Sequence, residues 1–248
     1  MSPFDLSGRQ ALVTGANTGL GQGIAVALAE AGADIVAVGR SAPDETAAMV
    51  KKAGRTLQSI KADLGSVAPI KAVMEQIEGP IDILINNAGM IRRNDAIDFT
   101  EEDWDAVMDV NLKSAFFLSQ AVARRMIAEK RPGKIINIAS MLSFQGGIRV
   151  ASYTSSKSGI LGLTRLLANE WAAKGINVNA IAPGYFVTNN TEALRQDEKR
   201  SAEILGRIPA GRWGKPSDLG GAAVFLASAA SDYVNGAVLP VDGGWLAR

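Results

Sequence analysis

The chain has 248 residues, of which 47% are apolar and 21% charged, a balance typical of a globular protein that buries a sizeable core. Its 26 Lys and Arg residues nearly balance 25 Asp and Glu residues, so no charge excess favours nucleic acid or an anionic membrane. The absence of Cys and His excludes disulfides, thiolate and imidazole metal ligands, and Cys- or His-based catalysis. We therefore expect no metal site, and catalysis must use Tyr, Lys, Ser, Thr, Asn, carboxylates or a bound cofactor.

Short apolar segments alternate with longer segments of helical periodicity along the chain. The predicted strands are residues 11–13, 35–38, 56–60, 81–85, 135–138, 178–181 and 238–241. The predicted helices are residues 21–30, 44–52, 70–77, 104–125, 153–171 and 218–227. Strands that are apolar on both faces and separated by helices predict an α/β fold. We expect a Rossmann-type, doubly wound parallel sheet of about seven strands with helices on both faces.

No linker or repeat divides the sequence, so residues 1–248 are predicted to form a single domain. The least regular stretch, about 184–214, is polar and carries Pro209, Gly211 and Gly214. An insertion of this length predicts a lid over a substrate, although a surface helical hairpin without function stays open as an alternative. No apolar segment is long enough to span a membrane, and no signal segment is visible, so we expect a cytoplasmic protein.

A glycine-rich segment, residues 14–21, directly follows the first predicted strand and opens the first helix. Gly15 permits a tight turn, Gly19 lets backbone N–H groups approach a phosphate, and Gly21 lets the helix pack on the strand. The helix N-terminus then presents free N–H groups and a partial positive charge to a pyrophosphate. The pattern predicts a dinucleotide site.

The residues after the second and third strands bear on the adenosine half of that dinucleotide. Gly39 stands where an acidic residue would bind the ribose, and Arg40 follows. Arg40 either binds a 2′-phosphate, which would favour NADP, or stacks on adenine or lies in solvent. Asp63 and Leu64 are placed to hydrogen-bond the adenine amino group.

Ser140 ends the fifth strand, and Tyr153 and Lys157 lie four residues apart on the next predicted helix, so their side chains share one face. A free phenol, with a pKa of about 10, is a poor base, and a neighbouring ammonium favours the phenolate. Ser140 could hold the reacting oxygen while Tyr153 transfers the proton. Asn86–Gly89 ends the fourth strand, and the carboxyl ends of parallel strands meet at one edge of the sheet.

On these motifs the chain resembles the short-chain dehydrogenase/reductase family over essentially its whole length. The matching motifs are 14–21, Asp63, 86–89, Asn111, Ser140, Tyr153 with Lys157, and Pro183-Gly184. The resemblance implies a seven-stranded parallel sheet and an assembly that is usually a tetramer or dimer. We expect a homotetramer.

The resemblance also implies roles. Tyr153 would be the general acid/base and Ser140 the stabiliser of the substrate oxygen. Lys157 would bind the nicotinamide ribose and lower the Tyr153 pKa, and Asn111 would hold a water that connects Lys157 to solvent. The expected cofactor-binding residues are Gly15, Asn17, Thr18, Gly19, Leu20, Gly21, Arg40, Asp63, Leu64, Asn87, Ala88, Gly89, Tyr153, Lys157, Pro183, Gly184, Val187 and Thr188.

Within the family, residues 14–22, 137–149, 182–190 and 207–213 are most similar to dehydrogenases of pectin and uronate breakdown. The implied reaction moves a hydride between a nicotinamide cofactor and a keto or hydroxy group of a deoxy sugar acid of the 2-dehydro-3-deoxy-D-gluconate or 2-deoxy-D-gluconate type. Such relatives are usually NAD-linked, and Thr18 offers no second cation for a 2′-phosphate. We expect NAD, with NADP not excluded.

A sugar acid carries a carboxylate, so the pocket needs a cation. The first choice is Arg149, four residues before Tyr153, and the second is Arg92; Arg93 and Arg212 are further candidates. Gln145, Tyr185 and Asn189 are candidates for binding hydroxyl groups. Trp213 and Trp245 are expected to pack or to contact another subunit.

Two other functions remain open. A 3-oxoacyl thioester reductase of the same family would favour NADP and an elongated pocket. A nucleotide-sensing protein without turnover would keep the fold but has no use for Tyr153 and Lys157, both of which are present. The expected partner is a small-molecule sugar acid, with no nucleic acid and no membrane.

Overall fold

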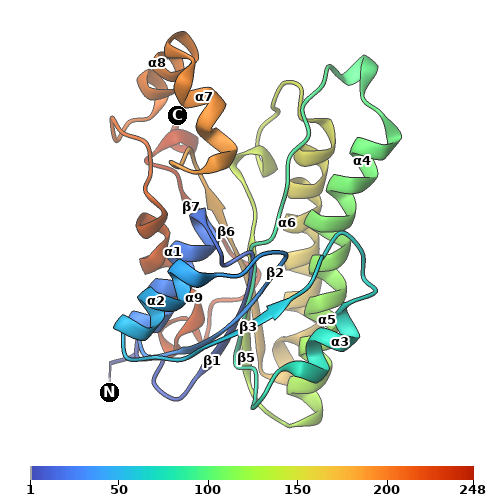
Figure 1. Cartoon of the computed structure of the whole chain (residues 1–248), viewed down its shortest axis with the longest axis vertical. Coiled ribbons are helices and arrows are strands. Elements are labelled where there is room, and N and C mark those ends of the chain that lie inside the picture. Colours follow the sequence, from blue (N-terminus) through green and yellow to red (C-terminus); the bar gives the residue numbers. More distant parts are fainter. Residues whose placement is uncertain (1) are drawn as a thin grey trace.

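A computed structural model describes residues 2–248 (Figure 1). Its centre is a seven-stranded parallel sheet in the order β3-β2-β1-β4-β5-β6-β7. The strands are β1 (Gln10–Thr14), β2 (Asp34–Gly39), β3 (Leu57–Lys61), β4 (Ile83–Asn86), β5 (Gly133–Ile138), β6 (Ile176–Pro183) and β7 (Val238–Val241). The strand order reverses between β1 and β4, so the carboxyl ends of these two strands flank a crevice where a ligand can bind.

Helices cover both faces of the sheet (Figure 1). One face carries α1 (Gly19–Glu30), α2 (Asp44–Lys52) and α9 (Gly220–Ala227). The other carries α3 (Ile70–Gln76), α4 (Glu101–Met108), α5 (Ser114–Ala128) and α6 (Ala151–Trp171). The predicted fold class, a doubly wound parallel sheet of seven strands, is confirmed.

The apolar strands explain this layering. Every residue of β4 and β5 is buried, so neither strand has a face free for solvent. Two buried clusters flank the sheet, one containing Ile24 and Leu28 of α1, the other Leu118 and Val122 of α5. Removing such side chains from water on both faces is the main favourable contribution to folding.

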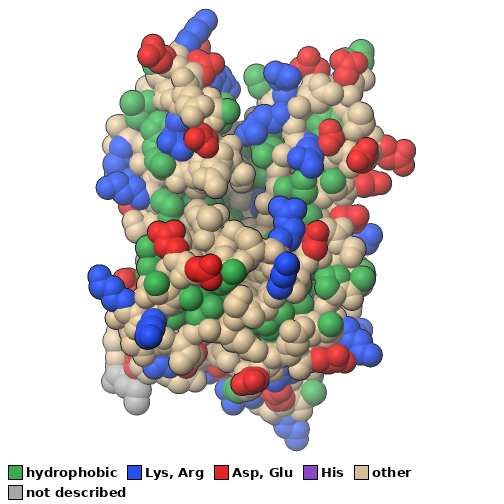
Figure 2. All heavy atoms as spheres, in the orientation of Figure 1, with side chains coloured by type: hydrophobic (Ala, Val, Ile, Leu, Met, Phe, Trp, Pro, Cys, Tyr) green, Lys and Arg blue, Asp and Glu red, His purple; other side chains and the backbone are tan. Residues whose placement is uncertain are grey.

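The segment 184–214 contains two short helices, α7 (Glu192–Gln196) and α8 (Glu198–Arg207), which project beyond the carboxyl ends of the strands (Figure 1). The upper part of α4 and the chain leading to it project on the opposite side. Figure 2 shows a hollow between these two projections, with Lys and Arg atoms on its rim. The insertion is therefore placed over the edge of the sheet where the predicted site residues gather.

The helix predicted over 104–125 is interrupted. The chain forms α4, then a π-helical turn at Asp109–Lys113, then α5. A π turn holds one residue more than an α turn and is frequent at functional sites. The sequence has helical periodicity throughout this segment and therefore does not predict the π turn. In the structure the turn coincides with the contacts that Asn111 makes with other elements.

Buried polar side chains connect the middle of the sheet to both long helices. Asn86 and Asn137 are register partners on β4 and β5, and the Asn86 Nδ2 donates to Asn137 Oδ1 (2.8 Å) and to the Ser119 hydroxyl on α5 (2.8 Å). Asn137 Nδ2 in turn donates to the Thr164 hydroxyl on α6 (3.0 Å). Because buried polar groups cost free energy unless they are paired, this chain fixes α5 and α6 relative to the strand ends.

Within residues 2–248, no helix combines the length and the apolar composition needed to cross a membrane. Over the same residues, no three acidic side chains lie close enough together to hold a metal ion.

Candidate active site

The glycine-rich loop between β1 and α1 has the backbone conformation that its glycines permit. Gly15 and Gly19 have positive φ angles of 66° and 59°, which other residues rarely adopt. A Cβ added at Gly21 would lie 2.1 Å from the carbonyl oxygen of Gly15, so only glycine fits there. The loop can therefore pass close to a ligand at the start of α1.

The turn after β4 is tied directly to this loop. The Thr14 hydroxyl accepts hydrogen bonds from the backbone N–H groups of Asn87 (3.0 Å) and Ala88 (2.9 Å). The Asn87 side chain donates back to the carbonyl of Thr14 (2.9 Å). These bonds hold the two turns together as one wall of a cleft at the crevice between β1 and β4.

The cleft contains most of the expected cofactor-binding residues. Its lining consists of Gly15, Asn17, Thr18, Gly19, Leu20, Gly21, Arg40, Asn87, Ala88, Gly89, Ile138, Ala139, Ser140, Tyr153, Lys157, Pro183, Gly184, Phe186, Thr188, Asn189, Asn190 and Thr191. Val187 does not line the cleft and is 40% exposed; its neighbour Phe186 lies there instead. The glycine-lined backbone and the uncapped N-terminus of α1 at Thr18 suit the phosphates of a dinucleotide.

A side cavity extends from the cleft toward β2 and β3, as expected for an adenosine site. Arg40, Asp63 and Leu64 all line it, together with Asn17 and Ser41. Asn17 Nδ2 donates to the Ser41 hydroxyl at 3.0 Å. The cavity thus offers the guanidinium of Arg40, the carboxylate of Asp63, an amide and a hydroxyl.

Ser140 lies at the end of β5 and begins a short turn, Met141–Ser143. Its hydroxyl oxygen accepts a hydrogen bond from the N–H of Leu142 (3.2 Å), which leaves the hydroxyl hydrogen to be donated elsewhere. The side chain is buried and lines the cleft. Ser140 is consequently held with its donor available to a neighbouring oxygen.

Tyr153 and Lys157 occupy the first two turns of α6, as their spacing predicts. The Lys157 Nζ lies 5.7 Å from the centre of the Tyr153 ring and donates to the carbonyl of Ile138 (2.6 Å). Burial lowers the pKa of Lys157 to about 8. The ammonium therefore faces the ring and the strand end, close to the cleft but not at the phenol hydroxyl.

That Lys157 lowers the Tyr153 pKa stays a prediction, and other groups act on the phenol as well. Burial raises the pKa of Tyr153 above 10, and the hydrogen bond with Ser140 and the positive charge of Arg93 both oppose this rise. Arg93 is thus a cation that favours the ionised phenol, in addition to the role expected of Lys157. Burial makes the phenol hold its proton more firmly than a free phenol does.

Asn111 lies in the π turn, with its side chain buried. Its Oδ1 accepts from the N–H of Met90 (2.8 Å), and its Nδ2 donates to the carbonyl of Met90 (3.0 Å) and to the Ser156 hydroxyl (3.2 Å). Asn111 therefore connects the turn after β4 with α6, next to Lys157.

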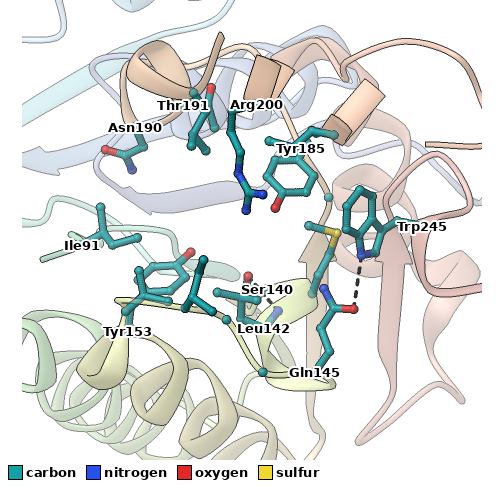
Figure 3. A pocket seen from close by; sticks show the side chains of 18 of the residues that line it. Ile91, Ser140, Leu142, Gln145, Tyr153, Tyr185, Asn190, Thr191, Arg200 and Trp245 are labelled. Carbon is teal, nitrogen blue, oxygen red and sulfur yellow. Dashed lines mark hydrogen bonds between the residues drawn. The ribbon is translucent and has the colours of Figure 1, made fainter. Parts of the chain in front are cut away.

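A second cavity, of about 460 Å³, adjoins the cleft at Ser140 and Tyr153 and lies between α8 and the turn after β5. Residues that line both this cavity and the cleft mark the junction, namely Ser140, Tyr153, Gly184, Asn190 and Thr191. Figure 3 shows Ser140, Tyr153 and Leu142 on one side, facing Arg200 and Tyr185 on the other. The Ser140–Tyr153 pair is thus positioned where a substrate and a nucleotide could meet.

The second cavity is positively charged, but its arginines are not Arg149 and Arg92, the first choices for binding a carboxylate. Arg93, Arg200 and Arg207 line it, with Glu203 as its acidic residue. Arg200, Glu203 and Arg207 lie on one face of α8, and none of the three was among the site residues expected from the sequence. Arg93 was a further candidate, and it also donates to the carbonyl of Asn190 (3.2 Å).

Arg149 and Arg92, the expected carboxylate ligands, do not line the cavity. Arg149 has a positive φ of 63° and pairs with Asp95 (3.2 Å). This left-handed backbone turns its side chain away from the cavity that its neighbours Ile148 and Val150 line. Arg92 pairs with Asp103 (3.1 Å), and Arg212 pairs with Asp218 (2.6 Å).

Of the candidates for hydroxyl binding, Gln145 and Tyr185 line the second cavity, whereas Asn189 lies in the cleft. Trp245 is buried and packs as expected, and it also lines the cavity, where its Nε1 donates to Gln145 Oε1 (3.3 Å; Figure 3). Tyr185 packs edge-on against Trp245, with ring centres 4.8 Å apart. This end of the cavity is therefore both aromatic and polar.

Comparisons with known proteins agree with this geometry. The family model described as enoyl-(acyl carrier protein) reductase matches residues 15–246. The chain is 62% identical to the 2-dehydro-3-deoxy-D-gluconate 5-dehydrogenase of Escherichia coli K12, covering 100% of this chain and 99% of that protein. It is 57% identical to the Bacillus subtilis protein of the same name, covering 99% and 97%.

A solved structure from Agrobacterium tumefaciens, provisionally described as a 2-deoxy-D-gluconate 3-dehydrogenase and with bound NADP, superimposes with a TM-score of 0.96. It is 62% identical, and all of both chains is covered. Full-length similarity at this level, together with the parallel sheet, the glycine loop and the Ser140, Tyr153 and Lys157 arrangement, shows that the chain belongs to the short-chain dehydrogenase/reductase family.

Proposed function

We propose that this protein is an NAD(P)-dependent dehydrogenase that interconverts a hydroxy and a keto group on a deoxy sugar acid, of the 2-dehydro-3-deoxy-D-gluconate or 2-deoxy-D-gluconate type. The observation that carries the proposal is the junction of the two cavities. Ser140 and Tyr153 line both the glycine-lined cleft and the arginine-lined cavity. A substrate there would have its reacting carbon at the phenol and its carboxylate among guanidinium groups.

The charge of the cavity favours an acid over a neutral substrate. Arg93 is placed to bind the carboxylate, because it lines the cavity and its charge reaches the Tyr153 phenol. Arg200, across the cavity in Figure 3 and paired with Glu203 (3.1 Å), offers a second guanidinium, and Gln145 and Tyr185 are available to sugar hydroxyls. Guanidinium–carboxylate pairs are geometrically specific, so they can fix which carbon lies at the phenol.

The residues of the site suit proton transfer to a carbonyl oxygen. A bound nicotinamide supplies the hydride acceptor or donor. Ser140 donates a hydrogen bond to the substrate oxygen and orients it. Tyr153 gives its proton to that oxygen in reduction and takes it back in oxidation. Lys157, beside the Tyr153 ring, would bind the ribose.

The cleft fits NAD and NADP. At the end of β2 the side cavity has Gly39 instead of a carboxylate, and Arg40 could pair with a 2′-phosphate there; the carboxylate of this cavity belongs to Asp63, after β3. The NADP-bound relative from Agrobacterium tumefaciens supports this reading. Use of NADP in addition to the expected NAD is therefore part of the proposal.

We further propose a cytoplasmic homotetramer. Phe117 of α5 and Leu166 of α6 are 38% and 49% exposed, beside an apolar groove that contains Leu112, Phe116 and Leu163. An apolar face formed by two long helices suits a second copy of the chain. The cytoplasm is proposed because a chain without cysteine draws no stability from an oxidising compartment.

An initial-rate screen with NADH, NADPH and their oxidised forms tests the function. The substrates are 2-dehydro-3-deoxy-D-gluconate, 2-deoxy-D-gluconate, an uncharged deoxy sugar and a short 3-oxoacyl thioester. The proposal expects kcat/KM for a sugar acid to exceed both controls at least about tenfold. Faster turnover of the thioester would favour an acyl reductase, and tight nucleotide binding without turnover would favour a sensor.

A further inference from the structure

Ser143 connects the two elements that carry the proposed catalytic groups. Its hydroxyl donates a hydrogen bond to the carbonyl of Lys157 on α6 (2.6 Å), and its oxygen accepts one from the backbone N–H of Ser140 (3.3 Å). The Ser143 side chain lines neither the cleft nor the second cavity. Any effect that it has on the reaction must therefore pass through Ser140 and Lys157.

We propose that Ser143 is a positioning residue for the reaction, which holds the turn of Ser140 in register with the helix that carries Tyr153 and Lys157. This inference rests on the proposed function. One hydroxyl fixes the start of the turn and the second turn of the helix at the same time. A small displacement between a catalytic donor and its acceptor can reduce the rate strongly.

Two other contacts show why one extra hydroxyl matters at this junction. Ser140 uses its own oxygen to accept from Leu142 N–H, and Lys157 Nζ donates to the carbonyl of Ile138, two residues before Ser140. The Ser143 hydroxyl adds a different bond, because it joins the turn to the backbone of the helix at the carbonyl of Lys157. Without it, Lys157 would still join α6 to Ile138 at the end of β5 through a flexible side chain, but the helix backbone would no longer be hydrogen-bonded to the turn.

The variant Ser143→Ala tests this proposal with sugar acid as substrate, and Ser143→Thr keeps the hydroxyl. We expect kcat of Ser143→Ala to fall about tenfold with the affinity for nucleotide changed less than about twofold, and Ser143→Thr to recover most of the rate. Ser228→Ala is the matched control, because the buried Ser228 hydroxyl also donates to a backbone carbonyl (Phe225, 3.0 Å). Unchanged kcat in Ser143→Ala would overturn the proposal.

A second measurement needs no turnover and therefore separates this proposal from the proposed function. The chain has three tyrosines, so the ultraviolet titration of Tyr153 can be obtained as the difference from a Tyr153→Phe protein. Displacing Ser140 weakens its hydrogen bond to the phenol, so Ser143→Ala should move this titration upward by about half a pH unit. An unchanged titration, or equal losses of thermal stability and rate in Ser143→Ala and Ser228→Ala, would reduce Ser143 to a structural contact.

Discussion

The Lys157 ammonium lies 5.7 Å from the centre of the Tyr153 ring, and both residues belong to the first two turns of α6. The ammonium is buried, and its hydrogen bond goes to a backbone carbonyl, that of Ile138. Lys157 thus carries its charge in buried surroundings that disfavour it, next to the phenol. Stability and activity should therefore respond in opposite directions when the charge is removed.

Lys157→Met tests that opposition. Burial lowers the pKa of Lys157 from 10.5 to about 8, so the folded protein holds this proton more weakly than the unfolded chain does. At pH 7 the variant should be more resistant to urea by about 1–3 kcal/mol, and it should lose turnover. Between pH 8 and 10.5 the wild type loses this proton only when folded, so its stability rises with pH and the difference shrinks.

Lys113→Met is the control for Lys157→Met, because Lys113 is exposed and pairs with Asp109 on the surface (2.9 Å). It should change the free energy of unfolding by less than about 0.5 kcal/mol at either pH. A Lys157→Met protein that is less stable than the wild type at pH 7, or equally shifted at pH 7 and 10, would contradict the electrostatic account.

Tyr153→Phe removes the hydroxyl and keeps the ring. We expect kcat to fall about 10³-fold, because a general acid is lost, with nucleotide affinity unchanged within about threefold. Steady-state rates and a fluorescence titration with NADPH measure the two quantities. Tyr233→Phe, at a fully exposed tyrosine, should behave as wild type, and near-normal rates in Tyr153→Phe would remove the phenol from the mechanism.

Arg93→Ala should affect both binding and proton transfer. Loss of a charged hydrogen bond to the carboxylate should lower kcat/KM for the sugar acid about 10- to 100-fold, and less for an uncharged sugar. The Arg93 charge lowers the pKa of Tyr153, so its removal should also move the pH profile upward. Arg149→Ala and Arg92→Ala, at arginines paired with Asp95 and Asp103, should leave both quantities nearly unchanged.

Arg40→Ala separates the two nucleotides. If Arg40 pairs with a 2′-phosphate, KM for NADPH should rise about tenfold while KM for NADH changes less than about threefold. Arg9→Ala is the matched control, since Arg9 pairs with the buried Asp82 (3.1 Å) and lies outside the described nucleotide cavities. Equal increases for both nucleotides would mean that Arg40 stacks on the adenine.

Phe117→Asp together with Leu166→Asp should dissociate the proposed tetramer, because charges on an apolar face oppose its burial. Light scattering after size-exclusion chromatography measures the mass. Ile97→Asp replaces a 93% exposed side chain elsewhere and should leave the mass unchanged. A wild-type protein that is monomeric at micromolar concentration would contradict the proposal directly.

The sequence predicts the sheet well, because most of its strands are short apolar segments that differ in pattern from the helices; β3, which contains Gln58, Ser59 and Lys61, is the exception. The predicted strand at 238–241 coincides with β7, and the helix at 44–52 coincides with α2. The places where a strand ends or a glycine turns were also accessible, so the positions of Ser140 and Gly15 relative to the cleft follow from local chemistry.

What the sequence did not predict depends on conformations that distant contacts select. Arg149 was chosen for its proximity to Tyr153 in sequence, but its positive φ directs it to Asp95. Arg200 lies 47 positions from Tyr153 and meets the cavity only because α8 projects over the sheet. Its helical spacing with Glu203 and Arg207 was a usable signal, but nothing local says which way that face points.

The π turn makes the long helical segment from Glu101 to Ala128 one residue longer than a regular helix of the same reach. Deleting one residue there would give a straighter helix, but would rotate one end against the other by about 100°. The Ser114 hydroxyl, which donates to the carbonyl of Leu64 (2.7 Å), and Asn111, which grips Met90, could then not both keep their partners. The contacts of Asn111 and Ser114 therefore fix the number of residues in this segment, whereas the length of a surface loop is not constrained in this way.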